Sequence, residues 1–314
     1  MLFDLASLTK PLVTAPLAFE HLDLDRDWAP TLGFVDWLGP ITPRLLLSHA
    51  AGLPPWLPFT GESMAEQIAA FTGWGGHPLL KRATWGESTY SDLGYRALGV
   101  ILEMETGQYW SVLGERLTGL SPAPWRESTV AMPPGADLAA WALSTTDPFP
   151  EPQPGCPHDA NARAGMVGHA GFGATPQQAR AWLGTWFQRY APLMAVETGL
   201  SQNGEVWGLG LQRLREGDGG FAPLLEGLGS GGIHVISDSG SDEPPRQTWS
   251  PADPPGGFSD WWFHLGYTGP ALFVSPRRSL CVLILCHRLS DGSGLLGIDA
   301  LKARRWQALK NYLQ

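Results

Sequence analysis

Two side chains near the beginning of the sequence have the types and the spacing of a catalytic pair. Ser7 stands three residues before Lys10, and an apolar run over residues 11–15 follows. If Ser7 opens a helix, Lys10 lies one turn further on the same face, beside the serine hydroxyl. A serine hydroxyl becomes a good nucleophile when a base takes its proton, and a lysine amine can do so only if its pKa falls from about 10.4. The spacing therefore predicts a nucleophile with its own amine, while an N-cap serine with a solvated lysine is the structural alternative.

The element that must position this pair is a helix, which we predict over residues 8–22 from their mainly apolar content. Pro11 is tolerated in the first turn of such a helix. Pro16 is expected to bend it, because proline has no N–H to donate. The sequence thus predicts a bent helix with the catalytic pair at its start.

A second pair of functional side chains, Tyr90 and Asp92, precedes another predicted helix. Apolar residues recur at helical spacing from Leu93, and Gly107 marks the end of the pattern. Side chains on a turn at a helix N-terminus can project into a crevice. An aspartate N-cap beside a packed tyrosine explains the same residues without any function, so both interpretations stay open.

The pattern of the chain changes from helix to strand near residue 205. Further helices are expected within residues 42–52, 63–71, 110–117, 176–190 and 296–313. Strands are expected over residues 206–214, 261–266, 271–275 and 280–287, and a long surface loop over 217–259. His49, in the first of these helices, is expected to be a structural hydrogen-bonding residue.

Composition and charge exclude several classes of protein. With 43% hydrophobic and only 16% charged residues, the 314-residue chain predicts a globular protein with a full core. A net charge of −9 argues against nucleic acid as a partner, because no basic stripe is present to neutralise phosphates. No run of 18 apolar residues predicts a membrane span. The N-terminus does not look like a signal peptide, so we expect a cytoplasmic protein, or a periplasmic or secreted one if the N-terminus is incomplete.

The cysteines and histidines predict neither a disulfide framework nor a metal site. Cys281 and Cys286, two of the three cysteines, lie five apart in a strand-like run, so they point to opposite faces and cannot pair. His158, Asp159 and His169 could be mistaken for metal ligands, but no spaced histidine pair on a helix supports that interpretation. We expect no metal and no cofactor.

Three short motifs stand in a recognisable order: Ser7-x-x-Lys10, Tyr90-x-Asp92 and His264-x-Gly266. Their order and spacing resemble the motifs of penicillin-recognising serine enzymes, which read Ser-x-x-Lys, then Ser-x-Asn or Tyr-x-Asn, then Lys-Thr-Gly or a His-x-Gly variant. The chain is similar to the branch that contains class C β-lactamases, D-alanyl-D-alanine carboxypeptidases, D-aminopeptidases and related esterases. Further segments similar to this family are residues 3–10, 46–54, 158–161, 167–172 and 276–288.

The resemblance implies an α/β (α+β) fold of the β-lactamase/transpeptidase type, with an antiparallel sheet flanked by helices and a helical domain. Residues 1–204 would form the mainly helical domain with the first two motifs. Residues 205–314 would form the sheet and the C-terminal helix, packed as one unit with the first. In the family a helix and two strands precede the nucleophile segment, but only six residues precede Ser7 here. Either the chain is a fragment, or the sheet is reduced to about three strands with an exposed edge through which molecules associate.

The resemblance also implies a role for each motif residue. Ser7 attacks a carbonyl and becomes acylated, and Lys10 keeps the serine proton moving. Tyr90 acts with Lys10 as the general base and later as the acid for the leaving group. His264 stands where many relatives have the motif lysine, and the backbone N–H groups of Ser7 and Tyr267 form the oxyanion hole. The residues expected to contact the substrate are Asp92, Gly266 and His169.

Two departures from the family motifs bear on the substrate. Asp92 replaces the usual asparagine and His264 replaces the lysine, so the site is less cationic and attracts carboxylate-bearing substrates less. An ionised Asp92 near Lys10 also opposes use of the amine as a base. We therefore expect an esterase or amidase that acts on small or neutral acyl substrates. The alternatives are a β-lactamase, a D-alanyl-D-alanine carboxypeptidase or D-aminopeptidase, and a catalytically inactive relative that binds cell-wall peptides or a protein.

Overall fold

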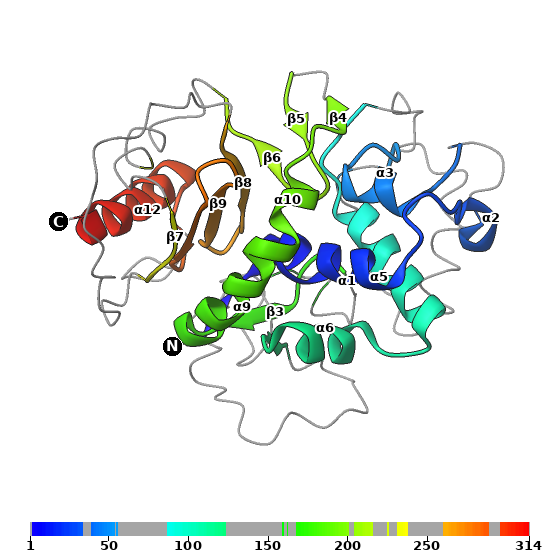
Figure 1. The fold of residues 1–314 in the computed structure, drawn as a ribbon, viewed down its shortest axis with the longest axis horizontal. Coiled ribbons are helices and arrows are strands. Elements are labelled where there is room, and N and C mark those ends of the chain that lie inside the picture. Colours follow the sequence, from blue (N-terminus) through cyan, green and yellow to red (C-terminus); the bar gives the residue numbers. More distant parts are fainter. Residues whose placement is uncertain are drawn as a thin grey trace.

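The structure is a computed structural model in which residues 2–33, 39–53, 55, 87–123, 159, 162, 168–200, 204–215, 225, 231–237, 260–288 and 296–313 are described. The helix expected over residues 63–71 lies outside them, as do Cys156 and His158. The described helices and strands form two sheets with helices around them (Figure 1).

The larger sheet has seven strands among the described residues, in the order β4-β5-β6-β8-β9-β10-β7. Neighbouring strands pair antiparallel except β10 and β7, which run parallel. A smaller sheet has the order β1-β3-β2. The strands are β1 (Phe3–Asp4), β2 (Ser121–Pro122), β3 (Phe172–Ala174), β4 (Gly199–Leu200), β5 (Val206–Trp207), β6 (Gln212–Arg213), β7 (Gly232–Ser237), β8 (Trp262–Leu265), β9 (Ala271–Ser275) and β10 (Leu280–Leu285).

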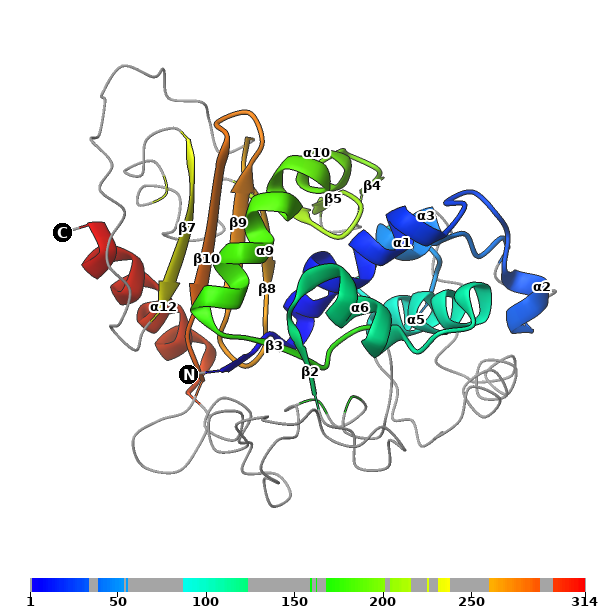
Figure 2. The same cartoon turned by 60° about the horizontal axis from the view of Figure 1, so that its bottom comes forward.

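Helices cover both faces of the larger sheet, with α12 (Ile298–Leu313) on one face and α9 (Pro176–Arg189) on the other (Figure 2). Strand β10 is buried along its whole length. Its alternate residues divide between two apolar clusters, one shared with α12 and one that belongs to the main core. Burial on both faces explains why this strand is a continuous apolar run in the sequence. The residues that share the α12 cluster are Leu280, Val282 and Ile284.

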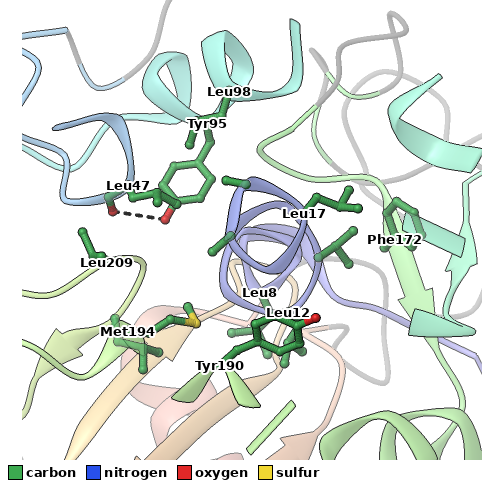
Figure 3. Packing of buried hydrophobic residues seen from close by; sticks show 14 of the residues in the cluster. Leu8, Leu12, Leu17, Leu47, Tyr95, Leu98, Phe172, Tyr190, Met194 and Leu209 are labelled. Atoms are coloured by element: carbon green, nitrogen blue, oxygen red, sulfur yellow. Dashed lines mark hydrogen bonds between the residues drawn. The ribbon is translucent and has the colours of Figure 1, made fainter. Parts of the chain in front are cut away.

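The helical part packs around the segment that carries Ser7. Helix α1 (Ala15–His21) contacts α5 (Asp92–Thr106) and α6 (Trp110–Thr118). Figure 3 shows Leu8, Leu12 and Leu17 of this segment among buried side chains from the elements around it. The remaining described helices are α2 (Ala29–Leu32), α3 (Pro43–Leu47) and α10 (Ala191–Met194). The main core is continuous from these helices to the α9 side of the larger sheet, and the domain division at residue 204 stays a prediction.

The nucleophile segment is not the single bent helix that the sequence predicts over residues 8–22. It consists of a 3₁₀ turn η1 (Ala6–Leu8), a π-helical turn η2 (Lys10–Thr14) and then α1. The π turn is seen in the N–H of Ala15, which donates to the carbonyl of Lys10 five residues earlier. Proline interrupts the usual ladder here, because the nitrogen of Pro16 has no hydrogen to give to preceding carbonyls.

Two tryptophans of α9 supply the donors that Pro16 cannot. The Trp186 indole N–H donates to the Pro11 carbonyl at 2.8 Å, and that of Trp182 donates to the Leu12 carbonyl at 2.9 Å. These carbonyls precede Pro16 by five and four residues, so a π-helix or an α-helix would have paired them with its missing N–H. Helix α9 is therefore hydrogen-bonded to the nucleophile segment as well as packed on the sheet.

Strand β7 corrects the expectation of a loop over residues 217–259. Residues 232–237 pair in parallel with β10 over the whole length of that strand. The short apolar run of β7 is enclosed by Gly, Ser and Pro, which hid the strand from sequence reasoning. The expectation of a reduced sheet that ends at its last strand is therefore wrong, because β7 covers that edge of β10. Association of molecules through an exposed sheet edge stays a prediction, and β10, whose edge pairs with β7, does not support it.

Residues 206–214 form a hairpin rather than the single strand that their alternating pattern suggests. Strands β5 and β6 pair antiparallel, with Trp207 opposite Gln212. The Gly208 N–H donates to the Leu211 carbonyl at 2.8 Å, and Gly210 has a φ of 104°, a conformation that glycine adopts without strain. The glycines therefore turn the chain where the alternation alone suggests continuity.

Most other element boundaries follow the signals in the sequence. The Thr175 and Gln178 side chains form a capping box at the start of α9, and α5 ends at Gly107, whose φ is 64°. Strands β8, β9 and β10 and helices α3, α6 and α12 confirm the elements expected there. Cys281 and Cys286 are both buried and form no disulfide with each other, as their spacing predicts. Within the described residues, no helix is both long and apolar enough for a membrane span.

Two helical glycines give a test of this packing. A Cβ on Gly114 of α6 would lie 2.5 Å from Phe172 Cζ and 2.7 Å from Val13 Cγ1, whereas a Cβ on Gly184 of α9 meets nothing within 4 Å. Gly114→Ala should therefore destabilise the protein by about 1–3 kcal/mol through overpacking. Gly184→Ala should leave stability unchanged or raise it by up to about 1 kcal/mol. Denaturant unfolding of both variants measures the difference, and equal effects would contradict the described packing of α6.

Candidate active site

The Ser7 side chain receives two hydrogen bonds. Its Oγ accepts from Lys10 Nζ at 3.0 Å and from the Tyr90 hydroxyl at 2.9 Å. The residue before it, Ala6, has a φ of 45°, which costs a non-glycine residue of the order of 1–2 kcal/mol. The Ala6 N–H donates to the buried Asp4 carboxylate at 2.8 Å, and this bond holds the strained turn. Such strain is common where a fold presents a reactive side chain.

Lys10 is completely buried, and its ammonium group contacts two further acceptors. Its Nζ lies 2.7 Å from Asp92 Oδ1 and donates to the His169 carbonyl at 3.0 Å. The same nitrogen lies 5.1 Å from the centre of the Tyr90 ring, within the range of a cation–π contact. The ammonium group thus has two hydrogen-bond acceptors and one ion-pair partner.

The charges around Lys10 favour its protonated form. Burial lowers the pKa of Lys10, but the Asp92 carboxylate and Tyr90 act in the opposite direction, and the pKa is raised overall. Burial raises the pKa of Tyr90 to about 12, although the positive charge of Lys10 partly offsets that effect. The resting site therefore holds a charged lysine and a neutral tyrosine, and both point hydrogen-bond donors at Ser7.

The turn that carries Tyr90 and Asp92 is fixed by Ser91 and His49. The Ser91 side chain caps α5 by accepting from the Gly94 N–H, and its own N–H donates to His49 Nδ1 at 3.0 Å. The N-cap is therefore Ser91, and Asp92 is the first residue of the helix, with its carboxylate at Lys10. This geometry differs from the simple aspartate cap that the sequence also allowed.

His49 is the structural hydrogen-bonding residue that the sequence predicts. Burial, and then the charge of Lys10, hold its pKa well below the usual value for histidine, so the ring is neutral. The ring contacts Tyr90, with a centroid distance of 4.8 Å, and Trp207 of β5, with a centroid distance of 4.6 Å. The turn that follows α3 and the strand β5 thus pack against the Tyr90 ring.

His169 contributes its backbone to the site. Its ring is 1% exposed, and Nε2 pairs with Asp159 Oδ1 at 2.8 Å. Although burial alone would raise the pKa of Asp159, the nearby His169 holds it well below the usual value, so the carboxylate is charged. The preceding Gly168 has a φ of 98°, and a Cβ there would lie 1.9 Å from the Tyr95 carbonyl. The turn therefore needs glycine, and it presents the His169 carbonyl to Lys10, while a contact of His169 with substrate stays a prediction.

The third motif lies on β8 and in the turn after it. His264 is 4% exposed, and its ring centre lies 5.9 Å from that of Tyr90. Burial and then the charge of Lys10 lower the pKa of His264 to about 3, so the imidazole is neutral at ordinary pH. The Thr268 hydroxyl donates to the Asp4 carbonyl at 2.9 Å, and a Cβ on Gly266 would lie 2.8 Å from the Leu5 carbonyl. The turn that contains Tyr267 therefore touches the nucleophile segment.

One protein family matches almost the whole chain. The family model described as Beta-lactamase matches residues 1–303. The chain belongs to the β-lactamase family. Its fold, a mixed α/β arrangement of antiparallel sheets flanked by helices, is the one that the sequence predicts. Membership of this family indicates a hydrolase in general terms.

Solved structures share this β-lactamase fold at low sequence identity. SurE with D-Leu is 22% identical with a TM-score of 0.58, and the match covers 100% of this chain but only 63% of SurE. The D-amino acid amidase from Ochrobactrum anthropi is 19% identical with a TM-score of 0.55, and 100% of this chain and 85% of the amidase are covered. A class C β-lactamase is 16% identical with a TM-score of 0.58, with 99% and 82% covered. A search of curated proteins finds no match.

Asp159 belongs to this site, although the sequence analysis considered its side chain only as a metal ligand. In the structure its carboxylate pairs with the ring of His169, ten residues later, and it also accepts from the Ala162 N–H at 2.8 Å. Within the described part of the chain, no group of three or more His, Cys, Asp or Glu side chains could hold a metal ion. The glycines around residues 168–173 indicate that the backbone there can lie close to another group. The sequence does not say which side chain that group belongs to.

The charge balance at Lys10 gives a pH prediction for this β-lactamase relative. Asp92→Asn restores the asparagine of the family motif and removes the carboxylate that raises the pKa of Lys10. Burial then dominates and lowers that pKa, so the amine becomes available at lower pH. We expect the rate of Ser7 labelling by a fluorophosphonate to rise with pH in the wild type, and the rising limb to move to lower pH in Asp92→Asn.

A matched control removes a carboxylate elsewhere. Asp25 pairs with Arg44 at the surface, at 2.7 Å, and Asp25→Asn makes the same change of charge away from Lys10. Its pH profile should coincide with that of the wild type. If the pH profile of Ser7 labelling in Asp92→Asn coincides with that of the wild type, or moves to higher pH, Asp92 does not hold the proton on Lys10.

Proposed function

We propose that the protein is a serine hydrolase that works through an acyl-enzyme on Ser7, and that it is an esterase or amidase. The observation that carries this proposal is the position of Ser7 Oγ, 3.0 Å from Lys10 Nζ and 2.9 Å from the Tyr90 hydroxyl. A nucleophile within hydrogen-bond reach of two groups that can exchange its proton meets the geometric requirement for covalent catalysis.

In the first half of the reaction Ser7 Oγ attacks the carbonyl carbon of the substrate. Its proton passes to the pair of Tyr90 and Lys10 in the form of that pair that has lost one proton, with either a neutral amine or a phenolate. The serine oxygen forms the new bond to the carbonyl carbon. The negative charge that develops on the carbonyl oxygen would be stabilised by the backbone N–H groups of Ser7 and Tyr267. Donors of this kind typically contribute a factor of about 100–1000 to the rate.

In the second half Tyr90 returns the proton to the leaving oxygen or nitrogen, and Ser7 carries the acyl group. Water then attacks the acyl carbon while the same pair takes a proton from it, and Ser7 Oγ leaves with that proton. The neutral His264 donates from Nδ1 to the Leu265 carbonyl at 3.1 Å, so its Nε2 can accept one hydrogen bond, but the ring brings no positive charge to the site near Tyr90. The roles of Ser7, Lys10, Tyr90 and His264 follow the expectations drawn from the motifs.

The charges of the site support a neutral acyl substrate. The ammonium of Lys10 is balanced by Asp92 at 2.7 Å, and His264 and His49 are uncharged. A substrate carboxylate would therefore meet no net positive charge from these four residues, which disfavours penicillins and peptide C-termini. Gly266 borders the nucleophile segment, where a side chain would not fit, and we keep it with Asp92 as a substrate-contacting residue. For His169 we propose a positioning role through its carbonyl.

The charge state of Lys10 also supports a second candidate function. A lysine that Asp92 keeps protonated is a poor base at neutral pH, and Tyr90, whose pKa is raised to about 12, is no better. A relative that binds an acyl peptide or a protein without turning it over is consistent with such a site. The two candidates differ in one property, the reactivity of Ser7.

Labelling followed by intact-mass measurement separates the candidates. The protein is incubated with a fluorophosphonate and, in a second sample, with a β-lactam, beside the Ser7→Ala variant. We expect a mass gain with the fluorophosphonate that Ser7→Ala abolishes, and little or no gain with the β-lactam. Absence of any gain in folded protein would refute the hydrolase and favour the binding protein.

A substrate panel tests the preference within the hydrolase proposal. We expect turnover of an acetyl ester or an amino acid amide to exceed that of a chromogenic β-lactam by at least about tenfold, which corresponds to about 1.4 kcal/mol in the barrier. Ser7→Ala measures the background for each substrate. Strong turnover of the β-lactam without turnover of the ester would show that the site accepts carboxylate-bearing substrates after all.

A further inference from the structure

The turn between β8 and β9 is held by an arginine from the last helix. Arg305 of α12 is 4% exposed. Its Nε donates to the Gly269 carbonyl at 2.6 Å, and its Nη2 donates to the carbonyls of Gly266 at 2.9 Å and Pro270 at 3.2 Å. All three acceptors belong to the five-residue turn that contains Tyr267. The sequence predicted only an amphipathic helix here, with basic residues between apolar ones.

Arg305 and this turn depend on each other electrostatically. A buried guanidinium is costly unless its N–H groups are paired. The ion pairs among the described residues do not include Arg305, and burial lowers its pKa relative to an exposed arginine. Its charge is therefore stabilised by backbone carbonyls, and those carbonyls must stay turned towards it. The turn cannot rotate a peptide group without leaving the buried charge with fewer partners.

One of these carbonyls shares a peptide group with the proposed oxyanion donor. The carbonyl of Gly266 and the N–H of Tyr267 belong to the same peptide plane, and no described peptide bond is cis. In a planar trans peptide the C=O and N–H bonds point in opposite directions. The Gly266 carbonyl accepts from Arg305 at 2.9 Å and from the Gly269 N–H at 3.2 Å, and these two bonds fix the direction of the Tyr267 N–H, which points away from α12. A charged donor on the carbonyl also polarises the amide and strengthens its N–H as a donor.

We propose that Arg305 is a positioning residue for the oxyanion hole, which acts by orienting and polarising the Tyr267 peptide group. This inference rests on the proposed function, because it needs Tyr267 N–H to stabilise the developing oxyanion. Arg305 itself lies behind the turn and does not contact the substrate. The last described helix is then part of the catalytic apparatus, through a backbone N–H that any residue except proline would supply at position 267.

The test compares Arg305→Lys with the same substitution one residue earlier on α12. Lysine keeps the charge but cannot bond three carbonyls in the geometry of the guanidinium. The matched control is Arg304→Lys, because Arg304 Nη1 donates to the His287 carbonyl at 2.8 Å and not to the turn that contains Tyr267. We measure the rate of Ser7 phosphonylation, kcat and KM for an ester substrate, and the melting temperature of each protein.

We expect Arg305→Lys to lower kcat and the labelling rate by about tenfold or more, but by less than the factor of about 100–1000 for complete loss of a donor. KM should change less than kcat, since the interaction strengthens in the transition state. Arg304→Lys should keep the wild-type rate even if its melting temperature falls. Arg305→Ala should regain part of its rate when a guanidinium salt is added at millimolar concentration.

The outcomes separate this inference from the proposed function. If the wild type does not label at Ser7, the hydrolase proposal fails and the role of Arg305 fails with it. If the wild type labels and folded Arg305→Lys labels at the same rate, only the role of Arg305 is refuted. A rate loss that merely follows the unfolded fraction, or that guanidinium does not reverse in Arg305→Ala, also refutes it.

Discussion

The burial of the Lys10 ammonium is the constraint on which the site depends. A fully buried positive charge costs several kcal/mol unless its donors are all paired and an opposite charge is near. Its partners are Ser7 in the nucleophile turn, Asp92 at the start of α5 and the His169 carbonyl before β3. These groups are far apart in the sequence, and each must reach the same nitrogen. The assembly of the site is therefore a condition for burying Lys10, not an addition to a finished fold.

The same constraint creates a conflict between stability and catalysis. Asp92 offsets the cost of burying Lys10, but by doing so it keeps the proton that a general base must lose. Asparagine, the residue usual in the family motif, would pair with the amine without fixing its charge. The aspartate therefore stabilises the folded site at the expense of a base at neutral pH. Substrate binding can change this balance if it excludes water from Asp92, whose side chain is 16% exposed, or if it draws the Asp92 carboxylate to a polar group of its own.

The sequence predicted those parts of the fold that local chemistry determines. Capping residues such as Thr175 and Gly107 gave helix ends, because they satisfy or terminate the backbone ladder where they stand. Strand β7 and the π turn could not be predicted in this way. The first gains its order from the neighbouring β10, and the second from indole groups of α9 about 170 residues away. Long-range partners decide both, and a local pattern does not contain them.

The residues of the candidate site also divide into those that local motifs identify and those that depend on long-range contacts. Ser7, Lys10, Tyr90 and Asp92 could be named from motifs, since the chemistry of nucleophile and base restricts the residue type at each position. The groups that hold them could not be named with their roles. The carbonyl of His169, and not its ring, bonds Lys10, and a motif of side chains does not indicate such a contact. Arg305 looks in the sequence like any basic residue on an exposed helix.

The two halves of the proposed catalytic apparatus are anchored in different layers of the protein. The proton-transfer groups lie on the helical side, where Asp159 supports the turn that bonds Lys10. The turn that would supply the oxyanion donor belongs to the sheet, and α12 holds it from the opposite face. These layers meet at the nucleophile segment, through the bond from Thr268 to the Asp4 carbonyl and the close approach of Gly266 to Leu5. A small shift between the layers would therefore change the distance from Ser7 to the oxyanion donor while leaving its bonds to Lys10 and Tyr90 intact. Reactivity of the serine and stabilisation of its transition state are separable properties in this fold, because different long-range contacts maintain them.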